Sequence, residues 1–388
     1  MNPAVMPTYG RTDVQFVRGE GAWLIDHHGE RYLDALSGLG VVALGHANEA
    51  VALALTHQSQ NLLHTSNLYR IPGQERLAER LAIISGMDNM FFGNSGAEAC
   101  ECAIKIARLY GHNKGFSDPT IIVAESAFHG RTMATLTATG NRKVQAGFEP
   151  LVSGFLRVPF NDVPAIEKIA ETANQVTAIF VEPIQGEGGI QVPDPTYLPR
   201  LRALCDANDW LLIVDEVQSG NARTGAYFCY QHSGILPDLV TTAKGLGNGV
   251  PIGVCLARGA AAEVFKPGNH GSTFGGNPLS CAAANAVLDE FERLNLIQHA
   301  AEMGDYIKAQ FRSHLAGDNR VRDIRGMGLM IGVELAKPCT ELIQQAFERK
   351  LLLNVTADSV IRLLPPLIIN QSEADLIVST VCDLIKQI

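Results

Sequence analysis

The sequence has no excess of basic residues. Its 388 residues include 31 lysines and arginines against 40 aspartates and glutamates, which gives a formal net charge of −9 at pH 7. Proteins that bind nucleic acid or an anionic membrane surface usually carry an excess of positive charge. We therefore expect neither partner, and any positive field that attracts an anionic ligand must be local.

Long apolar runs and a signal-like start are also missing. No apolar stretch reaches the roughly 20 residues that cross a bilayer, and the first twelve residues lack the basic, apolar and small-residue pattern of a signal peptide. We expect a cytoplasmic protein with no membrane segment. Because 46% of the residues are hydrophobic, the chain can bury a large core, and its length favours two domains over one.

The cysteines and histidines lack metal-ligand spacing. The eight cysteines contain no CxxC pair, and the eleven histidines contain no HxxxH pair. Zinc sites and disulfide frameworks both leave such patterns in a sequence. We expect no metal and no disulfide, and we interpret Cys100 and Cys102 as structural residues on different faces of one helix.

A lysine follows one strongly apolar segment. Residues 239–243 are typical of a buried parallel strand, and Lys244 comes next, among Gly245, Gly247 and Gly249. In open α/β sheets, ligands bind beyond the carboxyl ends of the strands. A lysine desolvated there has a lowered pKa, and its amine attacks carbonyl groups to form Schiff bases. The alternative is a lysine that holds a phosphate or is simply solvated.

An aspartate ends a second such segment, Leu211–Asp215. A carboxylate at the end of a buried strand needs a cation or hydrogen-bond donors in order to stay ionised. The ring nitrogen of pyridoxal phosphate is such a partner. Asp215 alone could equally be a helix cap or a turn residue. An Asp-ended and a Lys-ended strand in one α/β chain together favour a pyridoxal phosphate site.

Two loops after strands add groups suited to such a ligand. Residues 90–92 predict a strand that runs through Asn94 and Ser95 into a helix, and a helix N-terminus after a small polar loop binds anions. An ordinary N-cap is the alternative there. After a strand at 121–124, Phe128 could stack on a flat ring and Arg131 could bind a carboxylate. Alone, each is more often a packing aromatic and a surface arginine.

The order of elements predicts an α/β fold. Strands and helices alternate from about residue 90 to 257, which indicates a mainly parallel sheet covered on both faces. Residues 19–34 predict a hairpin, and a long helix at 279–294 precedes a mixed tail. We predict an N-terminal segment at 1–47, a large domain at 48–270 and a C-terminal segment at 271–388. The first and last of these form a smaller α+β domain.

Six motifs carry a resemblance that spans essentially the whole chain. They are NSGAEA (94–99), FHGRT (128–132), EPIQGEGG (182–189), DEVQ (215–218), TTAKGLGNGVPIG (241–253) and STFGGNP (272–278). In this order they resemble the class III, or ω-, aminotransferases, which are pyridoxal phosphate enzymes of fold type I. That resemblance implies a seven-stranded, mainly parallel sheet in the large domain.

Three further segments narrow the resemblance. YGR (9–11), LSGLGVVALGH (36–46) and HTSNLY (64–69) are similar to the N-acetylornithine aminotransferases. Those enzymes move the δ-amine of N2-acetyl-L-ornithine to 2-oxoglutarate in arginine biosynthesis. The products are N-acetyl-L-glutamate 5-semialdehyde and L-glutamate, in a ping-pong reaction through pyridoxamine phosphate.

The resemblance also implies roles for individual residues. Lys244 would bind the cofactor as a Schiff base and then move the proton, and Asp215 would keep the ring nitrogen protonated. The other cofactor residues would be Gln218 at the ring 3-oxygen, Phe128 and Val217 on the ring faces, Ser95, Gly96 and Ala97 at the phosphate, and Glu182. In the family the STFGG threonine reaches the phosphate of the partner subunit, so Thr273 implies a homodimer with shared sites.

Four residues would recognise the substrates. By resemblance, Arg131 with Ser272 nearby would bind the α-carboxylate of acetylornithine, and Arg362 would bind the α-carboxylate of glutamate or 2-oxoglutarate. Glu187 would pair with Arg362 while the ω-amine substrate is bound, which makes a charge switch. Other amine donors stay open: succinylornithine, ornithine, N-succinyldiaminopimelate and 4-aminobutyrate. An aminomutase is a less favoured alternative, and a cofactor-free regulatory relative is disfavoured because Lys244 and Asp215 are both intact.

Overall fold

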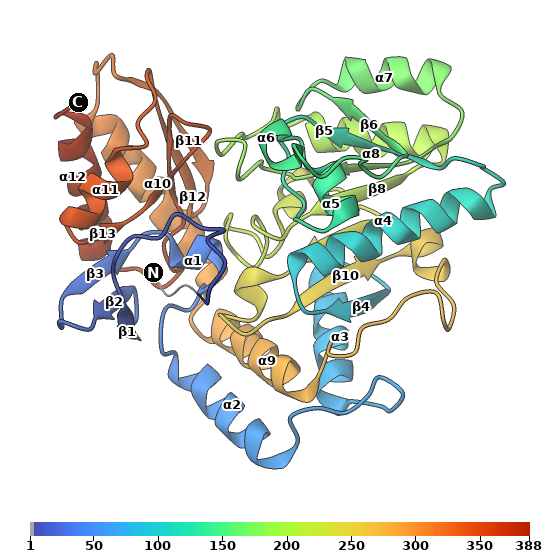
Figure 1. Ribbon diagram of the computed structural model, residues 1–388, viewed down its shortest axis with the longest axis horizontal. Coiled ribbons are helices and arrows are strands. Elements are labelled where there is room, and N and C mark those ends of the chain that lie inside the picture. Colours follow the sequence, from blue (N-terminus) through green and yellow to red (C-terminus); the bar gives the residue numbers. More distant parts are fainter. Residues whose placement is uncertain (1–3) are drawn as a thin grey trace.

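The computed structural model describes residues 4–388, and its centre is a seven-stranded sheet (Figure 1). In spatial order the strands are β4 (Asn89–Gly93), β10 (Gly253–Ala257), β9 (Leu239–Thr242), β8 (Leu211–Asp215), β7 (Val176–Val181), β5 (Thr120–Ala124) and β6 (Phe155–Val158). Strand β10 is antiparallel to both of its neighbours, and the other strand pairs in the sheet are parallel. The predicted α/β class with a mainly parallel sheet is confirmed.

Helices bury both faces of this sheet, which is why its central strands are apolar throughout. Leu211 and Ile213 of β8 pack in one cluster with the long helix α4 (Gly96–Asn113). Leu212 and Val214 point the other way, into the cluster that contains α8 (Tyr197–Asn208) and α7 (Val163–Thr172). Alternate residues of one strand therefore stabilise two separate layers.

The N- and C-terminal segments build a second region together. β1 (Phe16–Glu20), β2 (Trp23–Asp26) and β3 (Arg31–Asp34) form an antiparallel meander, and β13 (Leu351–Leu352) joins β3 in parallel. The predicted hairpin at 19–34 is part of this meander. In Figure 1 the blue N-terminal strands accordingly lie beside the red C-terminal helices. A third sheet has the order β11 (Val321–Met327), β12 (Met330–Leu335), β15 (Val360–Leu363) and β14 (Asn354–Thr356).

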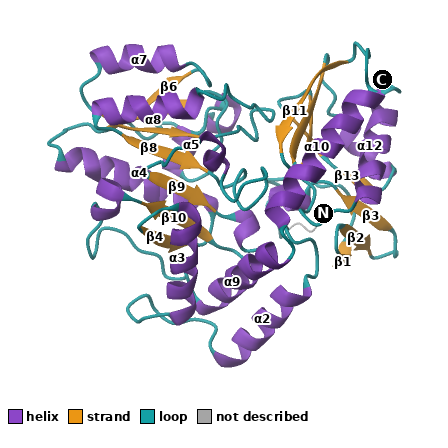
Figure 2. Ribbon diagram, turned by 180° about the vertical axis from the view of Figure 1, so that it is seen from behind, coloured by secondary structure: helices purple, strands orange, loops and turns teal. Residues whose placement is uncertain are grey.

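The remaining helices pack around these sheets (Figure 2). They are α1 (Ser37–Gly40), α2 (Glu49–Asn61), α3 (Pro72–Ser85), α5 (Met133–Ala138), α6 (Arg142–Gln145), α9 (Pro278–Arg293), α10 (Leu296–His314), α11 (Leu342–Glu348) and α12 (Gln371–Ile385), with short 3-10 turns at Cys229–Ser233, Lys244–Leu246 and Gly259–Glu263. Helix α9 contacts α2, α3 and α10, so it connects the large sheet's region to the C-terminal part. Within residues 4–388, no helix is long and apolar enough to cross a membrane.

Candidate active site

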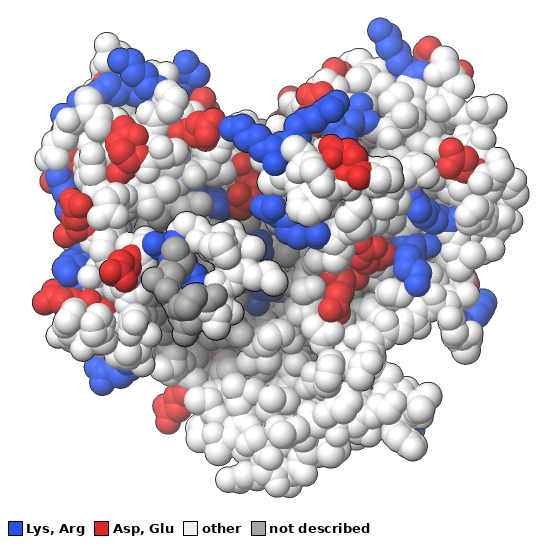
Figure 3. All heavy atoms as spheres, viewed as in Figure 1, with Lys and Arg blue, Asp and Glu red and all other residues white. Residues whose placement is uncertain are grey.

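A cavity of about 400 Å³ opens at the edge of the large sheet where the parallel strands end. Its lining includes many of the predicted site residues: Ser95, Gly96, Ala97, Phe128, Arg131, Glu182, Glu187, Asp215, Val217, Gln218 and Lys244. On the face seen in Figure 3, acidic and basic side chains are interspersed, with no large patch of either sign.

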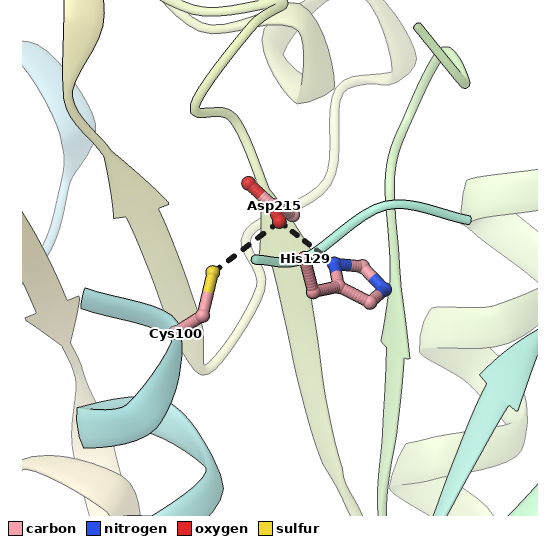
Figure 4. A group of neighbouring side chains, drawn as sticks. All are labelled: Cys100, His129 and Asp215. Atoms are coloured by element: carbon pink, nitrogen blue, oxygen red, sulfur yellow. Dashed lines mark hydrogen bonds and ion pairs between the residues drawn. The ribbon is translucent and has the colours of Figure 1, made fainter. Parts of the chain in front are cut away.

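Asp215 is buried at the end of β8 and is held by four donors. Its Oδ1 accepts hydrogen bonds from the backbone N–H of Val217 at 3.0 Å and from the Thr241 hydroxyl at 3.2 Å. Its Oδ2 lies 2.7 Å from Nδ1 of His129 and 3.3 Å from Sγ of Cys100 (Figure 4). Four contacts from different parts of the chain thus fix the orientation of the Asp215 carboxylate.

Lys244 follows β9 in a short 3-10 turn, with a positive φ of 45°. The end of β9 is fixed by Asn221, whose Nδ2 donates to the Thr242 hydroxyl and to the Ala243 carbonyl. Burial and the charge of Arg362 lower the pKa of Lys244 to about 8. The amine is therefore partly unprotonated at neutral pH, as a nucleophile towards a carbonyl must be.

The N-terminus of α4 forms one end of the cavity. Ser95 is its N-cap, since its Oγ accepts from the N–H of Glu98 at 3.2 Å, and among residues 4–388 the N–H groups of Gly96 and Ala97 have no acceptor. A side chain at Gly96 would not fit, because its Cβ would lie 2.6 Å from Cγ1 of Val217. The N-cap and the anion-binding interpretations of this loop are therefore compatible.

Phe128, Val217 and Glu182 form the middle of the cavity. The Phe128 N–H donates to Oε2 of Glu182 at 2.9 Å, which ties the aromatic residue to the end of β7. Burial raises the pKa of Glu182 to about 7, and the negative charge of Asp215 acts in the same direction. Apolar side chains thus line the same cavity as the free N–H groups of α4 and the Asp215 carboxylate, and we call the space beside Phe128 and Val217 the slot.

An ion pair lies beside the slot. Arg362, a fully buried residue of β15, donates from Nη1 to Oε1 of Glu187 at 2.6 Å and from Nε to Oδ1 of Asn354 at 2.9 Å. The Glu187 side chain is 40% exposed, so it can leave the pair more easily than the arginine can. Arg131 is exposed and stacks over the Phe128 ring at 5.6 Å, at the mouth of the cavity.

Three predicted residues are not among those that line the cavity: Arg362, Ser272 and Thr273. Thr273 is exposed, and the Ser272 hydroxyl accepts from Nδ2 of Asn94 at 3.2 Å and from the N–H of Gly275. The structure therefore places Ser272 beside the loop that precedes α4, and Arg131 is not among its hydrogen-bond partners.

Sequence reasoning missed some contacts of the predicted residues. His129 was available as a signal, because it lies within FHGRT between the two residues that were considered there. The purely structural interpretation of Cys100 was incomplete, since its thiol contacts Asp215. No sequence pattern links Asn354 to Arg362.

Cys100, His129 and Asp215 bring three possible metal ligand atoms within 4.8 Å of one another. Burial and the charge of Asp215 raise the pKa of the Cys100 thiol well above its usual value, so the sulfur stays protonated. Metals bind the thiolate, and His129 already engages the carboxylate. The cluster is better suited to holding Asp215 than to holding a metal.

This arrangement fits pyridoxal phosphate: N–H groups for a phosphate, a slot for a ring, a carboxylate for a ring nitrogen and an amine of lowered pKa. Residues 5–385 match the family model of aminotransferase class-III. The chain belongs to the class-III aminotransferase family and is an enzyme, a transaminase that depends on pyridoxal phosphate.

The relatives agree with this assignment. The chain is 56% identical over 381 residues to an acetylornithine aminotransferase of Nitrosomonas europaea, covering 98% of this chain and 97% of that protein. It is 50% identical to acetylornithine aminotransferase 1 of Bordetella pertussis, covering 100% of this chain and 98% of that protein.

Solved structures are similar as well. The ornithine aminotransferase of Toxoplasma gondii has a TM-score of 0.95 at 33% identity, covering 99% of this chain and 92% of that one. A second structure of that enzyme contains pyridoxal phosphate at its active site. The acetylornithine aminotransferase of Elizabethkingia anophelis has a TM-score of 0.87 at 32% identity, covering 99% and 96%.

We predict that Lys244 titrates near pH 8 in the cofactor-free protein. About one amine in ten is then neutral at pH 7, against fewer than one in a thousand for an ordinary lysine. Competitive labelling with trace acetic anhydride, quantified by mass spectrometry at each lysine, measures this pKa. Arg362→Gln should raise it, because the repelling guanidinium is gone, whereas Arg320→Gln, which breaks the ion pair with Asp318, should not. A Lys244 that titrates above pH 10 would contradict the electrostatic account.

Proposed function

We propose that this enzyme moves the δ-amine of N2-acetyl-L-ornithine to 2-oxoglutarate, giving N-acetyl-L-glutamate 5-semialdehyde and L-glutamate. The observation that carries the proposal is the meeting of Lys244, Asp215 and the Arg362–Glu187 pair around one cavity. The acetylornithine aminotransferases of Nitrosomonas europaea and Bordetella pertussis support the choice of substrate. The proposal places the enzyme in arginine biosynthesis and in the cytoplasm.

Each residue then has a distinct task. Pyridoxal phosphate, when bound, supplies an electron-withdrawing ring that makes a substrate C–H bond acidic. Lys244 would hold the cofactor through Nζ, and its freed amine would act as the acid–base group that moves the substrate's proton, a role for which a pKa of about 8 is suited. Asp215 would keep the proton on the ring nitrogen, and Gln218 would donate to the ring oxygen. Ser95, Gly96 and Ala97 would hold the phosphate, and Phe128 and Val217 would enclose the ring, with Glu182 fixing Phe128.

The Arg362–Glu187 pair separates the two half-reactions. In the amine half-reaction the pair stays closed, so the buried guanidinium is neutralised and attracts no carboxylate. In the 2-oxoglutarate half-reaction the more exposed Glu187 swings away, and the α-carboxylate takes its place on Arg362. Such an exchange avoids leaving a buried charge unpaired. Arg131, with Ser272, binds the α-carboxylate of acetylornithine.

A homodimer completes the site in this proposal. Thr273 lies on an exposed loop next to Phe274, which is 60% exposed, and Asn67 donates to the Ser272 and Gly275 carbonyls of the same loop. The adjoining Leu68 and Tyr69 are 86% and 69% exposed. Apolar residues grouped in this way favour contact with a second copy, which would bring Thr273 to the partner's phosphate site.

The proposal also divides the chain into segments 1–47, 48–270 and 271–388, with the first and last forming the small domain. The pairing of β3 with β13 supports this division, because it joins the two ends of the chain.

A substrate panel tests the proposed reaction. The purified protein, loaded with pyridoxal phosphate, is mixed with one amine at a time without a keto acid, and the loss of its yellow absorbance is followed. We expect N-acetylornithine to act faster than N-succinylornithine, ornithine, N-succinyldiaminopimelate or 4-aminobutyrate, and 2-oxoglutarate to restore the colour. Faster reaction with another amine would assign a different substrate. Turnover that never needs 2-oxoglutarate would favour the aminomutase.

Arg362→Ala should separate the half-reactions. We expect the rate with 2-oxoglutarate to fall about a hundredfold or more, since a buried charge partner is lost, and the rate with N-acetylornithine to fall about tenfold or less. Stopped-flow absorbance measures each half-reaction alone. Arg320→Ala, which removes an arginine that is ion-paired with Asp318, is the matched control. Equal losses in both half-reactions would exclude the charge switch.

Mixing two inactive variants tests the shared site. Lys244→Ala removes the amine, and Thr273→Asp places a negative charge at the partner's phosphate. A dimer of one chain of each kind has one site with both native residues, so we expect it to recover about half of the wild-type activity. Co-expression with two affinity tags isolates this dimer. If the mixed dimer is inactive, or Thr273→Asp alone is fully active, Thr273 does not act across subunits.

A further inference from the structure

Asp215 accepts hydrogen bonds from four different elements. Val217 follows it in the chain, Thr241 lies opposite it on β9, His129 comes from the loop after β5, and Cys100 comes from α4. Two of these donors share Oδ2, and Figure 4 shows His129 and Cys100 reaching that oxygen from opposite sides. The carboxylate is therefore fixed in orientation as well as in charge.

Cys100 is one of the residues that contact Asp215, and no function has yet been assigned to it. It is fully buried in the second turn of α4, and its Sγ lies 3.3 Å from Oδ2 of Asp215 and 3.6 Å from the Thr241 hydroxyl. Burial and the neighbouring negative charge raise the pKa of the Cys100 thiol far above neutral pH. The thiol therefore stays protonated and can donate a hydrogen bond. A donor to an ionised acceptor makes a stronger hydrogen bond than a neutral pair does.

His129 supplies only one of the hydrogen bonds to Oδ2 of Asp215. Its ring stacks on Phe180 with centroids 4.0 Å apart, and within residues 4–388 its buried Nε2 has no partner. The ring thus gives one donor, from one side of the carboxylate. Other charged groups around Asp215 are Lys244, Glu182 and Glu216, and none of these donates to it in the described structure.

Helix α4 gives Cys100 its particular position. The same helix begins with the Ser95, Gly96 and Ala97 loop that faces the phosphate end of the cavity. Its second turn, at Cys100, contacts the Asp215 carboxylate, which also lines the cavity. One rigid element therefore sets the distance between the two groups that would hold the ends of the cofactor.

We propose that Cys100 is a positioning residue: its thiol donates to Oδ2 of Asp215 and, together with His129, holds the carboxylate towards the cofactor's ring nitrogen. This inference rests on the proposed role of Asp215. Within residues 4–388, Cys102 makes no contact of this kind, although it is equally buried on the same helix, and its sulfur neighbours the Cys255 thiol of β10. The two cysteines are thus a matched pair for an experiment.

The test compares Cys100→Ala, Cys100→Ser and Cys102→Ala. Pyridoxal phosphate is titrated into each cofactor-free protein, and its dissociation constant is read from the quenching of intrinsic fluorescence. Loss of one hydrogen bond to a charged group should weaken binding about tenfold in Cys100→Ala. Cys100→Ser keeps a donor and should recover most of that loss, and Cys102→Ala should match the wild type.

A second measurement needs no cofactor. The infrared S–H stretch of Cys100, isolated as the difference between wild type and Cys100→Ser, should lie at lower frequency than that of a thiol without a strong acceptor. Asp215→Asn should move it upwards. Unshifted S–H absorption, or equal cofactor binding by Cys100→Ala and wild type, would overturn the inference. Failure of the wild-type protein itself to bind pyridoxal phosphate would instead overturn the proposed function.

Discussion

The structure depends on keeping two oppositely charged groups at one buried edge of a parallel sheet. Asp215 ends β8 opposite Thr241 of β9, and Lys244 follows just beyond the end of β9. An isolated ionised group in such surroundings is strongly disfavoured. Four donors contact the carboxylate, whereas no such set of partners surrounds the lysine within residues 4–388, and burial lowers its pKa to about 8. The same buried edge therefore holds a carboxylate in a fixed orientation and an amine that is partly neutral.

The elements around this edge of the sheet contribute different groups to the cavity. The N-terminus of α4 leaves the Gly96 and Ala97 N–H groups for an anion, and Gly96 allows Val217 to approach. The C-terminal part contributes Arg362 on β15, which pairs with Glu187 of the cavity lining, and the pairing of β3 with β13 joins this part to the start of the chain. In a protein of net charge −9, a buried cation thus lies beside the cavity and is paired with an acidic residue.

Much of the secondary structure could be predicted from the sequence, because it depends on residues that are close together in the chain. Leu211–Asp215 has the predicted bounds, and the helix predicted at 279–294 is found at Pro278–Arg293, because uninterrupted apolar runs and helical periodicity do not depend on distant residues. The reversal of β10 and the two-residue strand β13 were not predicted, since strand direction and pairing depend on tertiary structure. The contacts of Asp215 with Cys100 and His129 also join residues that are far apart in the chain. The roles of Ser272 and Thr273 require a second copy and remain predictions.

Reduction of the loaded protein with borohydride, followed by proteolysis and mass spectrometry, tests the central claim most directly. The reaction fixes a cofactor that is bound to a lysine, and the modified peptide identifies that lysine. We predict one pyridoxyl group per chain, on Lys244 alone, and none in Lys244→Ala. Modification of another lysine, or no modification of the wild-type protein, would contradict the assignment of this cavity as the catalytic site.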